Sequence, residues 1–300
     1  MTDAALATQR AVRVALLLLV LSTLSVGISG TFVRLSETGP TATAFWRMAL
    51  AIPAMGVLMA LEGRRTGTAP VRPSAGWDYF LLAAAGVVFG YEMGVWHIGL
   101  MMTSVANATL LSNCSPILVA LGTWLVLRQP LSRTFLLGMT IALSGAGILM
   151  GEDFSLSLNQ VYGDALAVVA AMLWGLYILI VARLRVRFGA PVIMLWTCVF
   201  ASLALLPFPF ILDETFLPSS LAGWAIVLSL ALVCQAAGQT LLTAALAHLP
   251  ATFSSVAFLM VPFNAALIAW LVLGEPVRPL QALGAVVVLA GVVLARRGTR

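Results

Sequence analysis

The chain consists almost entirely of apolar stretches, each about 20 residues long, separated by charged residues, Pro or Gly-rich segments. A helix needs about 20 mostly apolar residues to cross the hydrocarbon core of a bilayer. We expect ten transmembrane helices, at residues 12–35, 42–61, 77–97, 104–127, 134–150, 161–182, 191–212, 221–247, 252–273 and 279–295. The longest connection, 62–76, leaves no room for a soluble domain. The sequence therefore predicts an all-α integral membrane protein without an enzymatic head or an ATPase domain.

The composition agrees with a membrane protein. Hydrophobic residues make up 61% of the chain and charged residues 9%, whereas a soluble protein carries about 25% charged residues. The three Cys residues rule out a disulfide scaffold and show no metal-binding spacing. We therefore expect neither a metal ion nor a cofactor.

The basic residues, all of them Arg, predict the orientation in the membrane. With ten alternating helices, thirteen of the sixteen fall on the side of the N-terminus, which is the pattern of cytoplasmic loops. Only Arg34 and Arg278 fall on the other side, and Arg47 lies inside the second span. We expect both termini in the cytoplasm and the protein in the cell inner membrane. The net charge of +5 then reflects topology, so nucleic acid is not an expected partner.

The first stretch could instead be a secretory signal peptide, because Arg10 and Arg13 precede an apolar run that ends near Ser29 and Gly30. Its length exceeds the roughly 7–15 apolar residues of a signal-peptide core. The charge pattern also requires this helix, which favours a retained first span.

An internal repeat divides the chain into two halves. Residues 124–130 (WLVLRQP) return as residues 270–276 (WLVLGEP), five of seven identical at an offset of 146, which also pairs Pro116 with Pro262. Apolar helices can resemble one another through composition alone, but Trp and Pro are too infrequent to coincide so often. We expect two domains, 1–151 and 152–300, each of five helices. Since five is odd, the second half enters the membrane from the opposite side, and inverted repeats of this kind are typical of secondary transporters.

The chain resembles the EamA-type ten-helix exporters of the drug/metabolite transporter superfamily over almost its whole length. The resemblance rests on residues 113–116 (NCSP), 260–262 (MVP) and 274–276 (GEP), although Arg128-Gln129 stands where the family often has Gly-Glu in the first repeat. Residues 90–92 (GYE) resemble the aromatic amino-acid exporter branch. The resemblance implies export of small amphipathic metabolites, amino acids including aromatic ones, by alternating access.

Other functions are still open at this point. The solute could be a drug, a nucleotide or a sugar derivative, and the protein could be a channel. An intramembrane enzyme would need paired carboxylates, a Ser-His pair or an HExxH helix, and none of these is visible. The expected partners are a small-molecule substrate and the lipid bilayer. We expect a monomer, with a homodimer as the alternative.

Two charged residues lie at membrane depth, where ionisable side chains are costly and usually functional. Glu92 lies in the third span and Arg47 at a comparable depth in the second. They are candidates for a buried ion pair. Alternatively, Glu92 meets a substrate ammonium group or a coupling proton.

Pro116 and Pro262 occupy equivalent mid-helix positions and are expected to kink their helices. Each proline removes one backbone hydrogen bond, which frees the carbonyl of Ser112 or Phe258. Paired interruptions of this kind point to a central site, although neighbouring groups can also satisfy the carbonyls.

Polar and aromatic residues complete the predicted pathway. Gln235 and Gln239 are four residues apart and share a helical face. Neutral amides suit a zwitterionic or uncharged solute, and aromatic side chains can enclose a large apolar group. The candidates for lining the pathway are Tyr91, Glu92, Asn107, Asn113, Trp174, Tyr177, Gln235 and Gln239. Interhelical hydrogen bonding and core packing are the structural alternatives for these residues.

Overall fold

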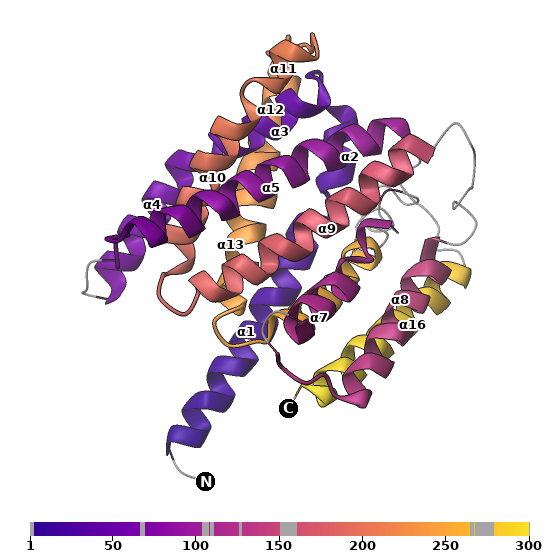
Figure 1. Ribbon diagram of the computed structural model, residues 1–300. Coiled ribbons are helices and arrows are strands. Elements are labelled where there is room, and N and C mark those ends of the chain that lie inside the picture. Colours follow the sequence, from indigo (N-terminus) through magenta and orange to yellow (C-terminus); the bar gives the residue numbers. More distant parts are fainter. Residues whose placement is uncertain are drawn as a thin grey trace.

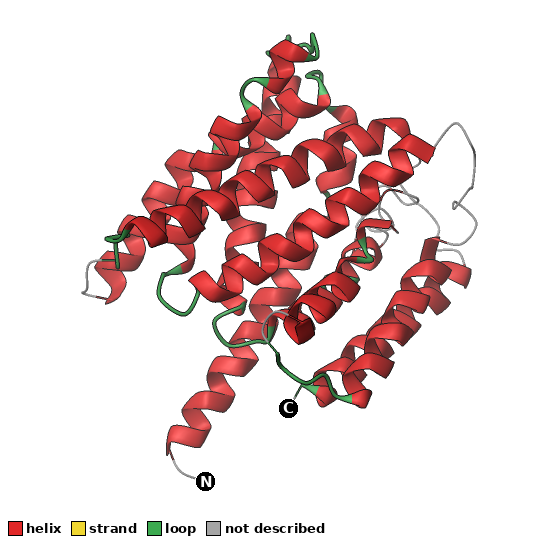
Figure 2. Ribbon diagram, viewed as in Figure 1, coloured by secondary structure: helices red, strands yellow, loops and turns green. Residues whose placement is uncertain are grey.

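The computed structural model describes residues 3–66, 70–103, 108, 111–125, 128–150, 161–264, 267 and 279–299. Within these residues every regular element is a helix (Figure 2). In this described part of the chain, seven helices are long and apolar enough to cross a membrane, and three shorter apolar helices lie at Ser115–Leu125, Arg133–Ile148 and Ala251–Asn264. Large apolar side chains such as Leu17 and Val286 are exposed, as on a surface that faces lipid. The chain is therefore a multi-pass helical membrane protein.

The helices follow one another in the order shown in Figure 1. They are α1 (Asp3–Gly27), α2 (Ser29–Leu35), α3 (Pro40–Ala49), α4 (Ala51–Thr66), α5 (Gly76–Met102), α7 (Ser115–Leu125), α8 (Arg133–Met150), α9 (Val161–Leu184), α10 (Ala190–Leu205), α11 (Phe208–Ile211), α12 (Leu221–Ser229), the π-helix η3 (Leu230–Gln239), α13 (Thr240–Ala245), α14 (Ala251–Ala257) and α16 (Pro279–Gly298). Most helix ends lie close to those predicted, but α1 begins at Asp3 instead of Val12, and α4 and α5 extend to Thr66 and Met102, beyond the predicted ends at Leu61 and His97. Parts of the predicted spans 104–127 and 252–273 lie outside the described residues.

Several helices predicted to be continuous are interrupted. The predicted helix 12–35 is divided at Ile28, between Gly27 and Ser29, and small residues of this kind permit a kink. The predicted helix 42–61 is divided at Leu50. Pro53 explains this second break, because it has no N–H to donate to the carbonyl four residues earlier. The predicted α-helix 221–247 contains η3, whose π-helical hydrogen bonding the residue pattern did not indicate.

Close helix packing surrounds the middle of the molecule. Helix α5 contacts α9 and α10, and α3 contacts α5, α10 and η3. Gly90 of α5 permits the approach of α10, since a Cβ atom there would lie 3.0 Å from the Cα atom of Ala201. Small residues at helix interfaces have this role in membrane proteins, where packing takes the place of the hydrophobic effect.

Helices α8 and α16 lie side by side at one edge of the molecule (Figure 1). They are antiparallel, because Gly138 faces Ala295 whereas Gly145, further along α8, faces Val288. A Cβ atom on Gly138 would overlap the backbone of the partner helix, as would one on Gly291. This glycine seam joins residues of the first and second halves of the chain.

Candidate functional site

Arg47 lies at the centre of a buried group of polar side chains. Its side chain is 1% exposed, and its Nη1 donates a hydrogen bond to Ser29 Oγ at 2.8 Å, at the break between α1 and α2. Its Nε has no hydrogen-bond partner. A guanidinium at membrane depth is costly, so an incompletely satisfied one indicates a function.

Glu92 is the acidic member of this group. It is 5% exposed, it lies on α5 next to α3, and its Oε2 has no hydrogen-bond partner. The predicted ion pair is not formed, because no nitrogen of Arg47 lies within 4.0 Å of a Glu92 carboxylate oxygen. The two charges nevertheless interact electrostatically. The structure therefore brings a buried cation and a buried anion to the same region and leaves both with unused hydrogen-bonding capacity.

Gln235 and Gln239 contribute amide groups from η3. Both are buried, and both Oε1 atoms are without a hydrogen-bond partner, while Gln235 Nε2 lies 3.8 Å from Cys198 Sγ. π-helical segments inside α-helices are frequent at functional sites. The predicted shared face of the two amides is thus present, but in a π-helix that packs against α3.

The predicted aromatic wall is also buried. Tyr177 stacks on Phe89 with ring centroids 4.6 Å apart, and Trp174 lies 5.6 Å from Tyr177 and 5.3 Å from Phe258. The Tyr177 hydroxyl lies 3.5 Å from the sulfur of Met194. These rings join α5, α9 and the segment after α14 in one cluster. Phe89 lies on α5 three residues before Glu92, so the aromatic wall and the carboxylate share this helix.

The structure does not place three predicted pathway residues in the polar centre. Tyr91 is 42% exposed and packs edge-on against Phe208, so the structure does not bring it to the polar centre. Asn113 is half-buried, and its Nδ2 has no hydrogen-bond partner. Asn107 lies outside the described residues, as does the predicted element 274–276.

Helix breaks occur just before both predicted prolines. Residues 113–114 form a turn before α7. Pro116 is the second residue of α7. Residues 258–259 likewise form a turn before the helical residues 260–264, which include Pro262. The Phe258 carbonyl, expected to be free, accepts a hydrogen bond from Val261 N at 2.9 Å. The second break is thus a tight turn that satisfies its own backbone.

His97 belongs to the buried polar group, although it is the last residue of the predicted span 77–97. It is 0% exposed, its Nδ1 lies 3.0 Å from Pro40 O, and its Nε2 has no hydrogen-bond partner. The available signal was a lone His at the end of an apolar stretch. Across the described ranges, no group of three or more His, Cys, Asp or Glu could hold a metal ion.

These features define a class of protein. Apolar helices that surround a buried cation, a buried carboxylate and unpaired amides are typical of membrane proteins that move polar solutes. The family model of the EamA-like transporters matches residues 13–151 and again residues 161–297. The chain belongs to the EamA-like transporter family.

Individual relatives agree with this assignment. An uncharacterized transporter of Archaeoglobus fulgidus is 27% identical over 269 residues, which cover 87% of this chain and 89% of the relative. The uncharacterized transporter YyaM of Bacillus subtilis is 25% identical over 266 residues, which cover 85% of this chain and 84% of the relative. A protein of known crystal structure, 18% identical in sequence, has the same fold. The TM-score is 0.76, and the match covers 97% of this chain and 99% of the chain in that crystal structure.

Proposed function

We propose that the protein is a secondary transporter with ten transmembrane helices in two inverted five-helix repeats, residues 1–151 and 152–300. Both termini face the cytoplasm, and the protein lies in the cell inner membrane. Support comes from the family model, which matches once in each proposed repeat. The two termini also lie at the same end of the molecule (Figure 1). An even number of spans would produce this arrangement.

The proposed substrates are small amphipathic amino acids, including aromatic ones, which the protein exports by alternating access. The observation that carries this proposal is the pair of unused groups, Arg47 Nε and Glu92 Oε2, in one buried region. A zwitterion would place its carboxylate on Arg47 and its ammonium group on Glu92. A solute of this kind would satisfy both charges without adding net charge to the membrane interior.

The remaining groups fit the same solute. The Oε1 atoms of Gln235 and Gln239 can accept further hydrogen bonds from an ammonium group. Trp174 and Tyr177 supply a wall for an aromatic side chain. Pro116 and Pro262 provide interruptions at which the helices can bend around the solute, and Asn113 lines the approach to it; Asn107 lies outside the described residues.

Counterflow in proteoliposomes tests the proposal. Labelled phenylalanine should enter vesicles preloaded with unlabelled phenylalanine in a saturable manner. Phenylalaninamide, which lacks the carboxylate, and phenylpropionate, which lacks the ammonium group, should each compete at least tenfold less well. The variant Asp213→Asn, which removes an exposed carboxylate from a connecting loop, serves as a control and should transport normally.

Different results would overturn different parts of the proposal. If no amino acid exchanges but a nucleotide sugar or a cationic drug does, the substrate class is wrong and transport stands. If flux rises linearly with concentration and shows no counterflow, the protein is a channel. Equal competition by the two analogues would remove the roles given to Arg47 and Glu92.

A further inference from the structure

A cluster of hydrogen bonds joins the first half of the chain to the second at one end of the helices. The carboxylate of Glu37, between α2 and α3, accepts hydrogen bonds from Ser219 N at 2.8 Å, Ser219 Oγ at 2.9 Å and Ser220 N at 2.9 Å. It also accepts one from Ser220 Oγ. Ser220 is the N-cap of α12 and its hydroxyl accepts a hydrogen bond from Gly223 N, so a residue of the first half binds the N-cap residue of a helix of the second.

The reverse contact lies beside it. Glu214, in the turn after α11, accepts hydrogen bonds from the backbone N–H groups of Thr41 and Ala42, both at 2.9 Å, in the first turn of α3. The Thr41 hydroxyl donates a further one at 2.8 Å, and Gly39 N donates to Thr215 O at 3.0 Å. A residue of the second half therefore caps a helix of the first. We call Glu37, Thr41, Glu214, Ser219 and Ser220 the Glu37 cluster.

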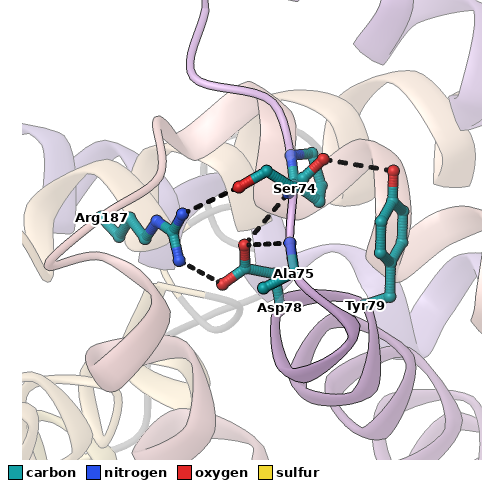
Figure 3. A network of polar contacts seen from close by, with 6 residues as sticks. Ser74, Ala75, Asp78, Tyr79 and Arg187 are labelled. Carbon is teal, nitrogen blue, oxygen red and sulfur yellow. Dashed lines mark hydrogen bonds and ion pairs between the residues drawn. The ribbon is translucent and has the colours of Figure 1, made fainter.

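A second set of contacts joins the two halves at the other end of the same helices. Arg187, between α9 and α10, forms an ion pair with Asp78 in the first turn of α5, with Nη1 and Oδ1 2.5 Å apart (Figure 3). Its Nη2 donates to Ser74 Oγ at 3.2 Å, and Asp78 Oδ2 accepts from Ser74 N at 3.1 Å. Nearby, a Cβ atom on Gly189, the N-cap of α10, would lie 2.8 Å from Glu62 Oε2. We call Asp78, Arg187, Glu62 and Gly189 the Arg187 cluster.

The two clusters are equivalent by position in the repeat. In each half, a charged residue in the turn before the second span binds the start of the third span of the other half. Glu37, before α3, binds Ser220 at the start of α12. Arg187, before α10, binds Asp78 at the start of α5. In each half, the glutamate near the end of the second span faces the start of the second span of the other half: Glu62 at α10, and Glu214 at α3. The offsets are 150 residues for the first pair and 152 for the second.

The clusters lie on either side of the polar centre. The span Pro40–Arg64 has Thr41 at one end and Glu62 at the other. At a rise of about 1.5 Å per residue, these two positions are about 30 Å apart. Arg47 lies between them, and both clusters are formed in the same structure. Residues of the two halves are therefore held together above and below the proposed substrate site.

We propose that the Glu37 cluster and the Arg187 cluster are the two gates of the transporter, and that each conformational change breaks one cluster while the other stays formed. This proposal rests on the alternating access proposed above. The Glu37 cluster would open toward the exterior and the Arg187 cluster toward the cytoplasm. Their chemistry differs, because Glu37 and Glu214 bind neutral N–H and O–H groups, whereas Arg187 binds a charged carboxylate.

Thiol accessibility tests the gates independently of transport. Cys198 and Cys234 are buried; Cys198 Sγ lies 3.8 Å from Gln235 Nε2 and Cys234 precedes Gln235 in η3, so both thiols report on access to the polar centre. With Cys114 replaced by Ala, a membrane-impermeant methanethiosulfonate reagent is applied to spheroplasts or to inside-out vesicles. Glu37→Gln combined with Glu214→Gln should raise the labelling rate from the exterior at least threefold and lower it from the cytoplasmic side. Arg187→Gln should do the opposite.

Matched controls separate a gate from a general loss of packing. Asp213→Asn lies next to Glu214, and Arg183→Gln removes an exposed Arg four residues before Arg187; neither should change labelling from either side. A disulfide between Glu37→Cys and Ser219→Cys should stop exterior labelling of the polar centre, leave cytoplasmic labelling intact and be reversed by a reductant. This variant closes a gate, so it tests the proposal even if the opening variants fold poorly.

The outcomes distinguish this proposal from the proposed function. If folded gate variants show unchanged labelling from both sides, the clusters are only structural contacts and the gate proposal is wrong, whatever is transported. If labelling shifts as expected while no amino acid undergoes counterflow, the gates stand and the substrate class is wrong. Equal increases from both sides in every variant, controls included, would also refute the gates, because they indicate loosened packing.

Discussion

Replacing Glu92 by Gln should make the protein more stable and less active. Glu92 is 5% exposed, its Oε2 has no hydrogen-bond partner, and no cationic nitrogen lies within 4.0 Å in the described part of the chain. A buried polar group without a partner costs about 1–3 kcal/mol, and a charged one costs more. An amide of the same shape removes the charge, so we expect a gain of about 1–3 kcal/mol in the free energy of unfolding.

The gain should appear in thermal unfolding of the purified protein in detergent. At about 2–4 °C per kcal/mol, the midpoint should rise by roughly 2–12 °C. After reconstitution of the same protein into proteoliposomes, counterflow of phenylalanine should fall at least tenfold, because the proposed ammonium partner is lost. Stability and activity would thus change in opposite directions, as expected where a strained charge is kept for function.

A paired carboxylate supplies the comparison. Asp164 accepts a hydrogen bond from Thr103 Oγ1 at 2.7 Å, so Asp164→Asn should bring no gain in stability. The reasoning is refuted if Glu92→Gln lowers the unfolding midpoint, since Glu92 would then be a structural partner. It is also refuted if the variant transports phenylalanine at the wild-type rate.

Three further predictions concern other parts of the molecule. Arg47→Gln should weaken competition by phenylalanine about tenfold or more, because hydrogen bonds to charged groups contribute about 1.5–3 kcal/mol. Competition by phenylalaninamide, which has no carboxylate, should stay the same. Competition assays in proteoliposomes measure both. Gly138→Val should lower the free energy of unfolding by about 1–3 kcal/mol through overpacking. Gly147→Val has nothing within 4 Å of its added Cβ atom, so it should change the free energy of unfolding far less in the same thermal assay. Hydrogen bonds from Ser220 and Ser219 lower the pKa of Glu37 from 4.5 to about 2, so its contribution to stability is complete above pH 4.5 and is lost as the pH falls toward 2. The difference in unfolding midpoint between wild type and Glu37→Gln should therefore be constant from pH 8 to about pH 5 and disappear below it, and a difference that disappears near pH 7 would contradict the assignment.

Local sequence patterns were sufficient for the apolar helices and for the charged residues inside them. Hydropathy is a property of consecutive residues, so the membrane spans could be predicted, and Arg47 and Glu92 stood out as exceptions within them. The break at Leu50 was also within reach, because Pro53 is adjacent in the chain. The absence of a direct contact between Arg47 and Glu92 depends on how two helices pack, which no local pattern records.

Other features had no local signal. Glu37 and Ser220 are 183 residues apart, and the local sequence around an acidic loop residue is the same whether it binds the start of a distant helix or faces water. The π-helix η3 has an ordinary apolar sequence, and no residue in it indicates π-helical instead of α-helical hydrogen bonding. His97 lies at the end of a predicted span, and nothing in the neighbouring sequence indicates that its ring is buried beside Pro40.

The glycine seam between α8 and α16 limits how the two halves can move. At Gly138 and Gly291, backbone lies directly against backbone, and each helix occupies the notch left by a missing side chain. Sliding by a fraction of a helical turn would bring Cβ atoms of neighbouring residues into collision with the partner helix. If the halves move relative to one another as proposed, they rotate about the glycine seam. The displacement of a residue then grows with its distance from this edge of the molecule.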